Sequence, residues 1–184
     1  MKKQLVVISA FFLALAGQAQ DKFFTKSGNI SFYSKSSLEN IEAHNKSVTC
    51  VLDTKSGNMQ FAVLMKGFEF EKALMQEHFN ENYVESHKYP KADFKGAVVN
   101  NSSISYTKDG SYPALVKGKL TLHGETRDVE TQGTILVRSG KIEATAEFNV
   151  LLADYNITIP SVVKDNISKS IRIQVNCTLD PLKN

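Results

Sequence analysis

The side chains of this sequence that most often carry chemistry are four histidines and two cysteines. The histidines are His44, His78, His87 and His123. They are too scattered to form a two-histidine metal motif, and the one alternative is a weak site that combines His78 and His87 with Glu81 and Glu85. A solvated helix face explains that spacing more simply, so we predict no metal site. His123 falls on the outward side of its strand, which predicts a surface position.

Cys50 and Cys177 are the two cysteines, and both fall on apolar strand faces. In a meander barrel, the strands that carry them would flank the first strand, which separates them by roughly 9–10 Å. That separation exceeds the usual Cα distance of a disulfide. We therefore favour two buried thiols that act as small hydrophobic side chains, with a disulfide as the alternative in an exported protein.

Motifs for nucleophilic or phosphate chemistry are absent from the sequence. No serine stands in a G-x-S-x-G turn, and there is no glycine-rich phosphate loop. Aspartates and glutamates are spread along the polar strand positions, so no carboxylate pair suggests acid–base catalysis. We therefore predict no catalytic residues, no cofactor and no enzymatic activity.

Alternation of apolar and polar residues with a period of two dominates the chain. Ile142, Ala144 and Ala146, for example, put one apolar face on a strand whose other face is polar. We expect eight or nine strands joined mostly by short turns, such as those at 123–125 and 139–140, which favours a barrel or a sandwich. Besides this strand, the expected strands cover residues 29–33, 47–53, 59–70, 94–99, 103–107, 114–122, 129–137 and 171–179.

Two segments depart from this alternation and predict helices. Over residues 71–85, Met75, Phe79 and Tyr83 recur at a spacing of four, which indicates a helix that lies across one end or side of the sheet. A second, shorter helix is expected over 160–165. The helix at 71–85 would thus cover part of the sheet that carries the apolar strand faces.

The first 19 residues have the order of a secretory signal peptide. A basic start at 1–3 precedes an apolar run over 5–16, and small residues at 17–19 provide a cleavage site. The run is too short to span a membrane. We therefore predict cleavage near Ala19, a single domain over 20–184, and a location in the periplasm or outside the cell.

The charge of the mature chain excludes some classes of function. The full chain has 22 basic and 19 acidic residues, a formal charge of +3, and loss of Lys2 and Lys3 with the leader lowers these to 20 basic residues and +1. A near-neutral chain with scattered lysines and arginines argues against nucleic-acid binding. No second long apolar run occurs, so we expect no membrane span in the mature chain.

Three stretches of the sequence resemble the YceI-like family. Residues 88–96 (KYPKADFKG) are similar to its Y-P-x-A-x-F motif, and residues 116–129 (VKGKLTLHGETRDV) to its G-x-L-T-(I/L)-x-G-x-T-(R/K)-x-V motif. Residues 148–163 (FNVLLADYNITIPSVV) are similar to members from Bacteroidetes-type bacteria. The resemblance covers about residues 23–180.

The resemblance implies an eight-stranded antiparallel barrel, lipocalin-like and periplasmic, with the helix at 71–85 packed against it. Some members hold a polyisoprenoid or another amphiphile in an apolar lumen, and no shared enzymatic activity accompanies the fold. The sequence departs from many members in having no tryptophan, with Phe23-Phe24 where the opening strand often carries one.

Strand parity predicts which side chains face the lumen. The expected lining residues are Phe32, Phe61, Val63, Phe94, Leu120, Leu122, Phe148, Val150, Ile173 and Val175. Small residues at the inward positions Gly118, Gly133, Ala144 and Ala146 favour a lumen with room in it, whereas a tightly filled core explains them equally well.

The leading hypothesis is periplasmic binding of a lipid, polyisoprenoid or similar amphiphile, so the expected partner is a hydrophobic or amphiphilic small molecule. One alternative is a structural or stress-protective protein with a filled core. A lesser alternative is an enzyme on a barrel scaffold, such as an isomerase or hydrolase. A homodimer is left open.

Overall fold

Nine strands account for most of the computed structural model, which describes residues 21–182; the predicted leader and its cleavage site lie outside this range. The strands are β1 (Lys22–Lys35), β2 (Asn40–Asp53), β3 (Asn58–Leu64), β4 (Glu69–Phe70), β5 (Lys91–Val98), β6 (Gly110–Leu122), β7 (Glu125–Arg138), β8 (Lys141–Leu151) and β9 (Ser170–Pro181). The helical elements are α1 (Ala73–His78), the π turn η2 (Phe79–Tyr83), and the 3-10 turns η1 (Met65–Gly67), η3 (Asn101–Ser103), η4 (Leu152–Tyr155) and η5 (Ser161–Val163).

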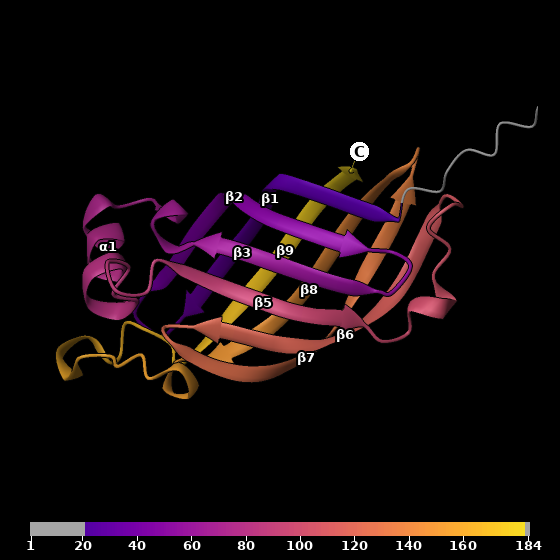
Figure 1. Cartoon of the computed structure of the whole chain (residues 1–184). Coiled ribbons are helices and arrows are strands. Elements are labelled where there is room, and N and C mark those ends of the chain that lie inside the picture. Colours follow the sequence, from indigo (N-terminus) through magenta and orange to yellow (C-terminus); the bar gives the residue numbers. More distant parts are fainter. Residues whose placement is uncertain (1–20, 183–184) are drawn as a thin grey trace, which may run out of the picture.

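Eight of these strands close into an antiparallel barrel. They pair in the order β1-β9-β8-β7-β6-β5-β3-β2, and β2 pairs with β1 to complete the ring. The two-residue β4 adds only a short pairing with Ala43 and His44 of β2. The predicted fold class, an eight-stranded antiparallel barrel with one helix, is confirmed (Figure 1).

Tight turns join the strands at the two sites expected from the sequence. Ser139 and Gly140 have φ of 51° and 76° between β7 and β8, and His123 and Gly124 have φ of 51° and 79° between β6 and β7. Two consecutive positive φ values match the twist of flanking strands in a two-residue hairpin. Both predicted turns are confirmed.

One of the expected strands is wrong in part and another is wrong altogether. The segment at 59–70 breaks after Leu64 because η1 intervenes, and the buried Asn45 amide donates to the Leu64 carbonyl at this break, at 2.9 Å. The segment at 103–107 forms no strand. There, the Asn100 side chain accepts from the Leu115 amide at 2.8 Å and Asn101 donates to the Thr54 carbonyl at 2.9 Å. Asparagine side chains thus take up backbone groups that a strand ladder would use.

The predicted helix at 71–85 is shorter than expected. α1 begins at Ala73 because Lys72 has an extended backbone, and η2 ends at Tyr83 before the buried Val84. The second expected helix, at 160–165, is only the 3-10 turn η5. None of the helices within residues 21–182 is long and apolar enough to cross a membrane.

The barrel interior has two halves of different character. At the end away from α1, large apolar side chains are fully buried, and Ile104 and Tyr106 from the connection between β5 and β6 pack onto them. We call this end the closed half; its members include Leu52, Val98, Val137, Ile142 and Leu179. The other end, next to α1 in Figure 1, is the hollow half.

Candidate ligand-binding cavity

A cavity of about 510 Å³ occupies the hollow half of the barrel. This volume lies within the range of about 300–1,000 Å³ that is usual for small-molecule sites. The ten lining residues expected from strand parity all border it, namely Phe32, Phe61, Val63, Phe94, Leu120, Leu122, Phe148, Val150, Ile173 and Val175. The cavity wall is therefore almost entirely apolar.

Strand register explains why these side chains gather. Phe148 of β8 pairs with Ile173 of β9, and Ile173 pairs with Phe32 of β1, so the three lie in one row across the sheet. All three face the interior, yet they are only half-buried. They keep exposed surface because they border empty space, whereas the closed half surrounds its side chains completely.

Four phenylalanines pack together where α1 meets the barrel. Phe79 of η2 lies 5.4 Å from Phe32, 5.6 Å from Phe68 and 5.1 Å from Phe70, between ring centroids. Stacked, tilted and edge contacts at such distances are all favourable for aromatic pairs. All four rings border the cavity, so Phe68, Phe70 and Phe79 are lining residues that strand parity missed. Their signal was present in the apolar run at 59–70 and in the helical spacing of Phe79.

The small inward residues have different roles. Gly96 and Gly118 pair across β5 and β6, and a Cβ built on either would lie 2.6 Å from the tip of the Phe94 ring. The ring therefore lies over both glycines, and Gly118 makes room for Phe94, not for the lumen. Gly133, Ala144 and Ala146 do border the cavity.

Charged side chains lie mainly at the α1 end of the cavity. Glu39 accepts a hydrogen bond from Asn166 at 3.3 Å, and the Lys72 ammonium is 3.6 Å from its other oxygen. His78 borders the cavity at the same end, and Asp93 borders it from β5. Within residues 21–182, no three His, Cys, Asp or Glu side chains gather as metal ligands.

The two cysteines lie inside the closed half as separate thiols. Burial raises the pKa of Cys177 to about 11 and also raises the pKa of Cys50. A thiol held protonated is a poor nucleophile and a poor metal ligand. Both cysteines therefore act as small core side chains.

His123 is not the surface residue that its strand parity predicts. Its side chain is only 10% exposed; Nδ1 lies 2.9 Å from the Tyr155 carbonyl and Nε2 lies 2.8 Å from a Glu85 carboxylate oxygen. The positive φ of the turn takes His123 out of the strand alternation. The hydrogen bond between His123 and Glu85 is the largest cause of the lowered pKa of the Glu85 carboxyl group.

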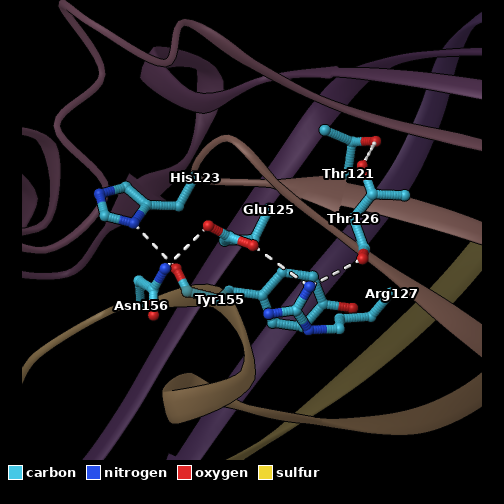
Figure 2. Close-up of polar contacts among 7 residues, drawn as sticks. All are labelled: Thr121, His123, Glu125, Thr126, Arg127, Tyr155 and Asn156. Carbon is cyan, nitrogen blue, oxygen red and sulfur yellow. Dashed lines mark hydrogen bonds and ion pairs between the residues drawn. The ribbon is translucent and has the colours of Figure 1, made fainter.

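The contact between His123 and the Tyr155 carbonyl helps to hold a short segment, residues 152–157, which we call the strap. Asn156 donates to Glu125 at 2.8 Å, and Glu125 also lies 3.2 Å from the Arg127 guanidinium, as Figure 2 shows. The paired part of β7 and β8 ends at Gly133 and Ala146, so the first half of β7 has no partner on β8. Tyr155 and Ile157 of the strap pack beside this gap on cavity-lining residues.

Comparisons with known proteins agree with this fold. The model of the YceI-like domain family matches residues 12–179. A polyisoprenoid binding domain from Saccharophagus degradans is similar at 14% identity with a TM-score of 0.76, over 89% of this chain and 100% of that one. BcnA of Burkholderia cenocepacia is similar at 16% identity with a TM-score of 0.67, over 83% of this chain and 95% of that one. No curated protein matches the sequence.

The family match spans nearly all of the chain, including the strands that build the cavity and both motifs noted in the sequence. The two solved structures share the fold at low identity. The chain therefore belongs to the YceI-like domain family.

Proposed function

We propose that this protein binds a lipid, polyisoprenoid or similar amphiphile and holds its apolar chain in the hollow half of the barrel. Each methylene moved from water into an apolar site contributes about 0.8 kcal/mol. A long chain can therefore bind tightly without polar recognition. This class of ligand is supported by the similar fold of the polyisoprenoid binding domain from Saccharophagus degradans.

One observation carries the proposal: inward-facing aromatic side chains such as Phe32, Phe94 and Phe148 border a cavity of about 510 Å³ and remain only half-buried. Side chains that border a void lose dispersion contacts on that side, and a bound apolar chain would restore them. The closed half shows how this sequence fills a core where no ligand is accommodated. This contrast favours a binding role over a structural protein with a filled core.

We also propose that the protein is exported and acts without catalysis. The basic start, apolar run and small residues near Ala19 support cleavage and a periplasmic or secreted location. The similarity of residues 148–163 to Bacteroidetes-type members supports a source in that group. The cavity wall is apolar, which suits retention of a ligand better than proton transfer.

The test is to purify the protein natively, extract it with organic solvent and identify the extracted molecules by mass spectrometry. We expect an amphiphile from wild type and from Asn149→Asp, which puts a charge on the outer face of β8. We expect none from Phe148→Asp, which puts the same charge into the cavity, with a circular dichroism spectrum that shows a folded barrel. An empty wild-type extract, together with no thermal stabilisation by added farnesol, would contradict the proposal.

A further inference from the structure

The deep end of the cavity is marked by a row of small and medium side chains on four neighbouring strands. Ala114 of β6 pairs with Gly133 of β7, Gly133 pairs with Ala146 of β8, and Ala146 pairs with Val175 of β9. Because paired residues share a face, the four side chains form one row across the inner face of the barrel wall, and we call each such row of paired residues a level. All four residues border the cavity.

The next level towards the closed half forms the floor of the cavity. Ile135 and Ala144 pair with each other, border the cavity, and are only 2% and 6% exposed. One level further, Val137 and Ile142 pair and belong to the closed half. The empty space therefore ends within two levels of Ala146, and an apolar chain that enters from the α1 end has a definite depth available to it.

We propose that this row sets the longest apolar chain that the cavity accepts, with Ala146 as the main specificity-determining residue. The proposal rests on the proposed function and adds a length limit to it. Ala146 is half-buried and borders the cavity, so a larger side chain there would occupy ligand space. Gly133 is unsuited to the same test because its Cβ would lie 2.5 Å from the Thr145 carbonyl oxygen.

The expected loss of affinity follows from the cavity volume that a larger side chain at position 146 occupies. Ala146→Leu adds three carbon atoms at the level of the row. Each methylene kept in water weakens binding about fourfold, so excluding about three weakens the longest accepted ligand by on the order of 60-fold. A shorter chain that ends above the row loses nothing. Ala144→Leu lies two residues deeper, about 7 Å along the strand, and should affect only a longer chain.

The experiment measures the dissociation constants of geraniol, farnesol and geranylgeraniol, which lengthen by one isoprene unit at each step. In wild type, we expect affinity to rise at each step until the chain reaches the floor. In Ala146→Leu, the increase of affinity with chain length should stop at an alcohol one isoprene unit shorter than in wild type. Ala144→Leu should shorten the longest accepted chain by less. Asn149→Leu, which adds bulk to the outer face of β8, serves as the matched control and should behave like wild type.

Thermal unfolding checks that each variant is folded, and Ala146→Val with Ala114→Val replaces Ala146→Leu if that variant does not fold. A uniform loss for all three probes, or no change in the limit, would overturn the length limit while the proposed function stands. Failure of wild type to bind any of the three probes would overturn the proposed function itself.

Discussion

β8 passes through both halves of the barrel, and its inward side chains show how differently the two halves are built. Ile142 lies in the closed half and is fully buried. Phe148 lies on the same face of the same strand, yet it is half-buried and borders the cavity. Alternation makes a side chain point inward, but its surroundings decide whether it stabilises the fold or remains available to a ligand.

The ends of the barrel account for this difference. In the closed half, Ile104 and Tyr106 enter from the β5–β6 connection, and burial raises the pKa of Tyr106 to about 12. In the hollow half, α1 and the strap pack on the rim, and Phe79 reaches in only as far as the phenylalanine cluster. One end is plugged by side chains, and the other is covered by segments that leave space beneath them.

The largest expected effect is on stability and separates the two halves. Leu179→Ala empties a fully buried site, so we expect unfolding free energy to fall by about 3 kcal/mol. Phe148→Ala removes a side chain that already borders a void, so we expect a smaller loss of unfolding free energy than for Leu179→Ala. Urea denaturation of ligand-free protein measures both. Equal losses would mean that the two halves are packed alike.

The next effect is on ligand affinity and has the opposite order. We expect Phe148→Ala to weaken farnesol binding by roughly tenfold, since a large apolar contact is lost. Leu179→Ala should leave affinity nearly unchanged at a temperature where the variant is folded. Isothermal titration calorimetry gives both values. A larger loss of farnesol affinity in Leu179→Ala than in Phe148→Ala would place the ligand in the closed half.

A smaller effect is expected at the strap, which covers one side of the hollow half. His123→Ala removes the hydrogen bond to the Tyr155 carbonyl, so we expect strap opening to become easier by about 1 kcal/mol. Amide hydrogen exchange at Tyr155 and Ile157 reports this opening. His44→Ala, a more exposed histidine on β2, should change neither amide. Unchanged protection in His123→Ala would show that the packing of Tyr155 and Ile157 and the hydrogen bond from Asn156 to Glu125 hold the strap without His123.

The smallest effect is a dependence of the strap on acid. Because its pKa is lowered in the folded protein, Glu85 contributes stability above the ordinary carboxyl pKa. That contribution is lost as the pH falls below the ordinary carboxyl pKa and through the lowered one, so we expect the protection of strap amides, corrected for their intrinsic exchange rates, to fall in acid. Glu85→Gln should lose this pH step. A step of the same size in Glu85→Gln would assign it to another carboxylate.

Much of the architecture follows from the period-two pattern. It predicted the barrel strands, two hairpin turns, and inward positions for ten residues that all border the cavity. The pattern works because side-chain direction in a strand depends only on position along it. It carries no information on depth, so it could not distinguish Ile142 in the closed half from Phe148 in the hollow half.

What the sequence could not predict lies mostly outside the strands. His123 sits in a turn with positive φ, where strand parity no longer applies, and its partners come from segments distant in sequence. Phe68 and Phe70 line the cavity because the 3-10 turn η1 interrupts the strand before them. The Phe94 ring fills the space above Gly118, and this contact depends on the register between β5 and β6, which the sequence does not give.

The central claim is that an apolar chain enters the hollow half and leaves the closed half untouched. Methyl NMR spectra recorded during a farnesol titration test it most directly. We predict shifts for the cavity methyl groups of Val63, Leu122 and Ile173, and constant signals for those of Leu52, Ile142 and Leu179. Shifts spread evenly over both halves, or confined to the closed half, would contradict it.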